Sequence, residues 1–172
     1  MFSKSNKKIS QSQKNCSLIF GIVYSAVGFF VHISTKNPYS TIHTLGIDEY
    51  IPPLWIFNLL SLFWLFESGR AAGRVCGEIM ISRASGKREI AIYQGFLFFT
   101  SLFFMSLCWY PLFFGTMRIG LSLLVSVACV VCSVGCGIYW SSLGAYPTII
   151  MFSNAIWLFY MMIVNLLAVL SS

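Results

Sequence analysis

The final third of the chain, residues 119–172, contains no acidic or basic side chain. A membrane-spanning helix needs about 20 apolar residues, so this stretch is too long for one span and long enough for two. Residues 141–147 (Ser-Ser-Leu-Gly-Ala-Tyr-Pro) supply a break between them. Glycine and proline interrupt helices, and proline is tolerated in the first turn of a new one. Two membrane-spanning helices are therefore expected here.

Three further uncharged stretches, residues 15–35, 50–66 and 90–117, are each bounded by charged side chains. The second is slightly short, and its helix is expected to continue through Ala71 and Ala72. Charged residues make up 9% of the chain, whereas a soluble domain carries roughly 25%. We therefore predict an all-α integral membrane protein with five transmembrane helices. Residues 1–15 form a polar amino-terminal tail, and residues 16–172 form one domain.

The basic residues test this count, because cytoplasmic loops of membrane proteins carry an excess of lysine and arginine. With the amino terminus inside, nine basic residues fall on the inner side and two, Lys36 and Arg118, on the outer side. The amino terminus is therefore placed on the positive, inner face. The net charge of +6 is assigned to topology and lipid head groups, since no basic–aromatic patch for nucleic acid is present.

The first apolar stretch has a second interpretation, as the apolar core of a signal peptide over residues 17–30 that follows a lysine-bearing start. The stretch is long, however, and no small-residue cleavage pattern follows Phe30. We expect a retained first helix.

Two connections differ in character. Residues 36–49 form a long outer loop without helical periodicity, and loops of this length are usually functional. Residues 73–89 are basic and contain three glycines, which predicts a solvated inner connection with a frayed helix end.

Cys129-Val130-Val131-Cys132, followed by Cys136, permits two interpretations. A thiol oxidoreductase would need a second cysteine pair in the outer loop, and residues 36–49 contain none. The alternative is a stripe of small residues that eases helix packing. No metal site is expected, because no histidine or carboxylate lies in this span. No catalytic set can be assembled, and Glu67 with Arg70 fits a structural ion pair on one helical face.

Three motifs together resemble one family. Residues 52–57 (Pro-Pro-Leu-Trp-Ile-Phe), followed by Gly69 and Ala71, are similar to the second-helix motif of the TspO/MBR family of tryptophan-rich sensory and translocator proteins. Residues 109–115 (Trp-Tyr-Pro-Leu-Phe-Phe-Gly) resemble its third-helix motif, and Tyr146-Pro147 resembles the start of its fifth helix. The resemblance covers about residues 16–170.

The resemblance implies a five-helix membrane receptor or transporter, often a homodimer, that binds a small hydrophobic ligand in a cavity covered by the first loop. Protoporphyrin IX, haem and sterols are the ligands it implies, with no required cofactor. The ligand is expected under residues 36–49, against Trp109 and the helix face bearing Trp55 and Ser61. A porphyrin-degrading or thiol-dependent membrane enzyme, and an assembly partner in a membrane complex, remain alternatives.

The chain departs from the family motifs at several ligand positions, while Trp109 is retained. The second tryptophan of the second helix falls at Ser61, the glutamine and asparagine of the third helix fall at Leu102 and Ser106, and the fifth-helix tryptophan falls at Met151. The cavity is thus expected to be more apolar than usual. The candidate ligand-binding residues are Trp55, Ser61, Leu102, Ser106, Trp109, Phe113 and Met151.

Overall fold

The computed structural model describes residues 2–35, 38–81 and 87–171, which form helices and no strand. Five helices are long: α1 (Phe2–Ser34), α3 (Leu54–Ile81), α4 (Lys87–Tyr110), α5 (Ile119–Trp140) and α6 (Ala145–Ser171). A short helix α2 (Pro38–Thr44) and a 3₁₀ turn η1 (Asp48–Tyr50) separate α1 from α3, and a π-helical turn η2 (Pro111–Gly115) follows α4.

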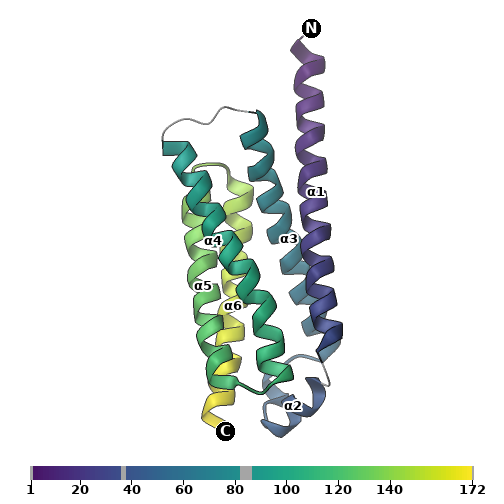
Figure 1. Ribbon diagram of the computed structural model, residues 1–172, viewed down its shortest axis with the longest axis vertical. Helices are drawn as coiled ribbons and strands as arrows, with labels where there is room; N and C mark the ends of the chain where they lie inside the picture. Colours follow the sequence, from purple (N-terminus) through teal and green to yellow (C-terminus); the bar gives the residue numbers. More distant parts are fainter. Residues whose placement is uncertain (1, 36–37, 82–86, 172) are drawn as a thin grey trace.

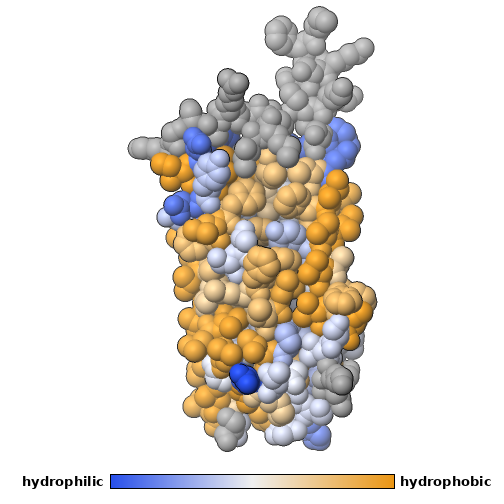
Figure 2. All heavy atoms as spheres, viewed as in Figure 1, coloured by the Kyte–Doolittle hydropathy of each residue, from blue (hydrophilic) through white to orange (hydrophobic). Residues whose placement is uncertain are grey.

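The surface of the bundle is that of a membrane protein. The shortest long helix, α5, has 22 residues and is about 33 Å long at 1.5 Å per residue, enough to cross a hydrocarbon core of about 30 Å. Large apolar side chains are exposed on all five long helices, among them Phe30, Leu124 and Ile156. Figure 2 shows hydrophobic residues across the middle of the face in view, with hydrophilic residues toward its two ends.

Four stretches are long and apolar enough to span a membrane: Gln13–Ser34, Arg88–Gly115, Ile119–Trp140 and Ala145–Ser171. Helix α3 is not one of them, because Glu67 and Arg70 lower the mean hydropathy of its apolar half. The all-helical membrane architecture is therefore confirmed, and the predicted break at residues 141–147 coincides with the turn between α5 and α6.

Two expectations about the connections are wrong. Residues 38–44 of the outer loop are helical, and Pro38, in the first position of α2, has a φ angle suited to a helix start. Helix α3 continues to Ile81, so a solvated connection does not begin at residue 73. Gly73 and Gly77 do not end this helix, because they pack against α1 instead. Residues 82–86 of this connection lie outside the described residues, and residues 87–89 belong to α4.

The five long helices form two groups, a helix pair (α1 and α3) and a three-helix unit (α4, α5 and α6). Figure 1 shows α1 beside α3, and α4, α5 and α6 together on the other side of the bundle, with α2 at the same end as the carboxyl terminus. Within the pair, a Cβ atom at Gly69 would lie 2.7 Å from the Phe20 carbonyl oxygen, so the two backbones nearly touch. Such contact through small residues is a common way to join membrane helices.

The three-helix unit is joined by buried polar contacts. The Ser122 hydroxyl of α5 donates to the Asn165 side-chain oxygen of α6 at 2.6 Å. Ser133 donates to the Met151 carbonyl at 2.8 Å, and the Cys136 thiol donates to the Gly95 carbonyl of α4 at 3.5 Å. Contacts between this unit and the α1–α3 pair are fewer, and the cavity described next lies at that seam.

Candidate ligand cavity

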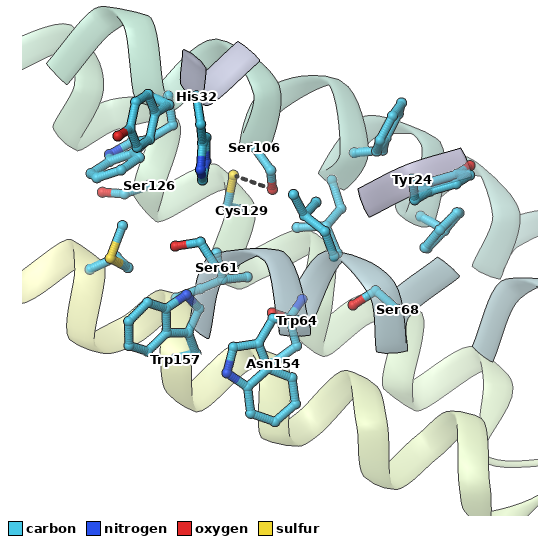
Figure 3. Close-up of a pocket in the computed structure, with 18 residues that line it drawn as sticks. Tyr24, His32, Ser61, Trp64, Ser68, Ser106, Ser126, Cys129, Asn154 and Trp157 are labelled. Carbon is cyan, nitrogen blue, oxygen red and sulfur yellow. Dashed lines mark hydrogen bonds between the residues drawn. The ribbon is translucent and has the colours of Figure 1, made fainter. Parts of the chain in front are cut away.

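An elongated cavity lies between the helix pair and the three-helix unit, and every long helix contributes to its wall (Figure 3). Its empty space, counted with its open mouth, is about 700 Å³. The wall is mostly aromatic and aliphatic. It is formed by Tyr24, His32, Ser61, Trp64, Leu65, Ser68, Phe99, Leu102, Phe103, Ser106, Trp109, Tyr110, Ser126, Cys129, Asn154, Trp157, Leu158 and Met161.

Trp109 belongs to a cluster of rings at the α2 end of the cavity. Its indole is nearly parallel to the Phe113 ring, with centroids 5.2 Å apart, and meets Phe114 edge-on. The π-helical turn that begins at Pro111 follows directly. Pro111 lacks an amide hydrogen and disturbs the regular ladder, and the Thr116 amide bonds to the Pro111 carbonyl at 2.9 Å. Turns of this kind occur frequently at functional sites.

Three residues of the wall carry a buried polar atom that has no hydrogen-bond partner among the described residues: His32 Nδ1, Ser68 Oγ and Trp109 Nε1. Buried polar groups in native proteins are almost always satisfied, so each exception calls for an explanation. One further atom of this kind, Trp140 Nε1, lies outside the wall, where the indole packs on Gly95. Three of the four unsatisfied atoms thus belong to residues of one cavity.

The family follows from the sequence comparison. Residues 18–170 match the TspO/MBR family, which is nearly the whole chain. The chain belongs to the TspO/MBR family. The resemblance seen in its proline–tryptophan motifs is thereby confirmed. Comparison with the curated proteins gives no match. Membership supports a multi-pass membrane protein of the sensory or transporter-like kind.

Four of the seven candidate residues, Ser61, Leu102, Ser106 and Trp109, lie together in the wall of this TspO/MBR cavity. The other three lie elsewhere. Phe113 is fully buried and stacks on Trp109 from outside the wall. Met151 is fully buried in the core of the three-helix unit, where its carbonyl accepts from Ser133. Trp55 is 66% exposed on the outer surface of α3.

The position of Trp55 has a geometric reason. It lies six residues before Ser61, which is one and two-thirds helical turns, so the two side chains point about 120° apart. Trp55, Leu59 and Phe63 form an exposed stripe at four-residue spacing. Ser61 lies on the other face of α3 with Leu65 and Ser68, toward the cavity.

The sequence interpretation missed several wall residues, of which His32 is the most informative. Its ring stacks on Tyr110 with centroids 3.9 Å apart, and the Tyr110 hydroxyl donates to the Asn58 side-chain oxygen at 3.1 Å. A histidine inside a predicted span was the available signal, since ionisable residues at membrane depth are functional candidates. Trp64 and Trp157 also line the cavity, but no sequence signal separates them from lipid-facing aromatics.

Residues 38–50, between α1 and α3, pack on the α2 end of the bundle. Thr41 donates from its hydroxyl to the Phe114 carbonyl at 2.9 Å. Ile42, Leu45 and Ile47 are buried against the cluster that contains Trp109. The imidazole of His43, by contrast, is exposed and lies 3.4 Å from Asp48. An apolar face of this segment is thus fixed over the rings, and its polar face points away.

The ion pair expected from sequence is present at the other end of the cavity. Arg70 donates to Glu67 Oε1 at 2.7 Å, and Glu67 is buried. The Tyr146 hydroxyl of α6 donates to Glu67 Oε2 at 2.7 Å, and the Arg74 guanidinium lies 3.9 Å from the centre of the Tyr146 ring. These groups satisfy one another beside the cavity, and none of them belongs to its wall.

The six cysteines are free thiols. Of the three in α5, Cys129 reaches the cavity wall, with its sulfur 3.8 Å from the Ser106 hydroxyl. Cys136 bonds to the Gly95 carbonyl, and Cys132 is buried in the same core. Within the described part of the chain, no group of three histidine, cysteine or carboxylate side chains is arranged to hold a metal.

Proposed function

We propose that this TspO/MBR protein binds a small hydrophobic ligand, a tetrapyrrole or a sterol, in the cavity between its helix pair and its three-helix unit. It would act as a membrane receptor or transporter for that ligand. The observation that carries the proposal is the cavity itself, which has an aromatic and aliphatic wall and three residues with unsatisfied buried polar atoms. Mostly apolar pockets with a few polar groups are typical of ligand sites.

The proposal includes α3 as a fifth transmembrane helix, with the amino terminus on the positive, inner side. Helix α3 has 28 residues and packs along α1. Its Glu67 is neutralised by Arg70 and accepts from Tyr146, which makes a charge near membrane depth tolerable. Arg70 is one-third exposed, so its head group can reach the interface.

The segment from Pro38 to Tyr50 is proposed as the lid of the cavity. Two hydrogen bonds connect it to the three-helix unit. The Thr41 hydroxyl donates to the Phe114 carbonyl, in the turn that follows α4, and the Tyr50 carbonyl accepts from the Tyr160 hydroxyl of α6 at 2.7 Å. Its buried side chains pack on the rings around Trp109. Releasing these two hydrogen bonds would uncover the α2 end of the cavity.

A fluorescence titration tests the proposal. Protoporphyrin IX or the fluorescent sterol dehydroergosterol is added to purified protein in phosphatidylcholine nanodiscs, and quenching of tryptophan emission or energy transfer is recorded. We expect a saturable signal that weakens in Trp109→Ala and survives in Trp55→Ala, because Trp55 lies on the outer surface. Absence of a saturable signal with both probes would refute the proposal.

A membrane enzyme is the second candidate, favoured only by the place of Cys129 in the cavity wall. A thiol that reacts with a bound ligand has to reach the ligand, and Cys129 meets this condition. Unchanged behaviour of a Cys129→Ser variant in a redox assay would remove the thiol-dependent version of this candidate.

A further inference from the structure

Among the described residues, none that forms the wall of the cavity is a lysine, arginine, aspartate or glutamate. Glu67 and Arg70, which lie one and two residues from the wall residue Ser68, are paired with each other outside the wall at 2.7 Å. A buried carboxylate or sulfate without a counter-charge is costly, because it loses its water without regaining an equivalent partner. The electrostatics of the wall therefore oppose an anionic ligand.

Two of the unsatisfied polar residues lie far apart along the cavity. Gly69, next to Ser68, packs against Gly21 of α1, and His32 lies eleven residues further along the same helix. At 1.5 Å per residue this places His32 about 16 Å from the level of Ser68. Figure 3 shows the two side chains toward opposite ends of the cavity. The aliphatic and aromatic wall between them suits a long apolar body.

The hydrogen-bonding capacity of these groups limits the ligand further. A serine hydroxyl can donate and accept, a neutral imidazole can do both, and an indole N–H can only donate. A hydroxyl group on the ligand can pair with any of the three, and a carbonyl oxygen can pair with the donors. Such a partner would satisfy a buried atom that has no hydrogen-bond partner among the described residues.

We propose that the cavity selects elongated, uncharged molecules with a hydroxyl or carbonyl group near one end, and that it discriminates against carboxylates and sulfates of the same shape. Ser68 at one end and His32 with Trp109 at the other supply the hydrogen bonds. This selectivity rests on the proposed function, since it concerns the ligand of the same cavity.

Matched pairs of probes test the charge preference. Cholesterol and cholesterol sulfate compete with dehydroergosterol in phosphatidylcholine nanodiscs, and protoporphyrin IX dimethyl ester is compared with the free diacid. We expect the uncharged member of each pair to bind at least about tenfold more tightly, a difference of about 1.4 kcal/mol or more. Nanodiscs without protein correct for partition into lipid.

The outcomes separate the two proposals. Equal binding within each pair, or tighter binding of the charged member, overturns the selectivity and leaves the ligand cavity standing. Absence of saturable binding by all four compounds refutes the ligand cavity and the selectivity together.

Variants test the residues. Ser68→Ala and Trp109→Phe each remove one hydrogen-bonding group, and we expect a loss of about three- to tenfold in cholesterol affinity for the variant whose group pairs with the sterol hydroxyl. Ser142→Ala, an exposed serine in the α5–α6 turn, is the matched control. Unchanged cholesterol affinity in both Ser68→Ala and Trp109→Phe would contradict the assigned hydrogen bonds.

A gain-of-charge variant gives the converse test. Ser61→Lys places a cation in the wall, and we expect the preference for cholesterol over its sulfate to fall or reverse. If this variant folds and keeps the original preference, the absence of a counter-charge does not set the selectivity. If it does not fold, the probe pairs on the unaltered protein still decide the question.

Discussion

Tyr146 of α6 donates a hydrogen bond to the buried carboxylate of Glu67 on α3, with 2.7 Å between the two oxygens. Glu67 also accepts from Arg70 on its own helix. The Tyr146 bond thus joins the three-helix unit to the helix pair beside the cavity. It belongs to a small set of side-chain links across a seam where the described helices otherwise touch little.

Tyr146→Phe is expected to destabilise the protein by about 1–3 kcal/mol, because it leaves one buried carboxylate oxygen of Glu67 without its donor. The free energy of unfolding, measured by denaturant titration in detergent, checks this. Tyr139→Phe is the control, since Tyr139 is partly exposed and its ring stacks on Phe98 while its hydroxyl makes no hydrogen bond to a described residue. Equal stability of Tyr146→Phe and the unaltered protein would show that the bond contributes nothing.

Gly69→Ala tests the close contact between α1 and α3. The added Cβ would lie 2.7 Å from the Phe20 carbonyl oxygen, so the helices must separate, and overpacking of this kind costs about 1–3 kcal/mol. Gly120→Ala in α5 is the matched control, because nothing lies within 4 Å of its Cβ position. We expect Gly69→Ala to lower the melting temperature and Gly120→Ala not to lower it. A similar change in melting temperature in the two variants would contradict the tight packing of α1 against α3.

The hydrogen bond between Ser122 and Asn165 tests the three-helix unit. Both residues are fully buried, and the bond is 2.6 Å long. A double-mutant cycle with Ser122→Ala and Asn165→Ala is expected to give a coupling energy of about 0.6 kcal/mol and at most about 1.7 kcal/mol, the mean and the maximum found for hydrogen bonds between membrane helices. The cycle of Ser122→Ala with Tyr139→Phe should be additive. A coupling energy near zero in the first cycle would mean that apolar packing, and not this hydrogen bond, stabilises the three-helix unit.

The helices of this protein could be predicted from sequence because their signals are local. Charged residues bound the apolar stretches, and the glycine and proline near residue 145 separate α5 from α6. Hydropathy does not predict where α3 ends, because this helix continues to Ile81, beyond its apolar stretch. Gly73 and Gly77 read locally as flexible positions, but they remain helical because α1 packs against them.

The composition of the cavity could be predicted only in part. Ser61, Leu102, Ser106 and Trp109 were found because family motifs mark their positions. Whether a residue beside a motif faces the cavity, the core or lipid depends on how each helix is rotated about its axis. That rotation is determined by contacts between helices, such as the hydrogen bond from Ser133 of α5 to the Met151 carbonyl of α6 in the core. The sequence of one helix alone therefore does not predict how that helix is rotated.

The variant His32→Phe tests whether the imidazole lowers the stability of the protein while it contributes to ligand binding. The imidazole is stacked on Tyr110, and its Nδ1 is buried without a partner. Phenylalanine keeps the stack and removes the unsatisfied atom, whose burial costs about 1–3 kcal/mol. We therefore expect His32→Phe to be as stable as the unaltered protein or more stable, measured by thermal melting, and to bind cholesterol less tightly. His43→Phe, at the exposed histidine of α2, should change neither quantity. A loss of stability in His32→Phe would mean that the imidazole has a structural partner, and unchanged stability with unchanged binding would remove it from the ligand site.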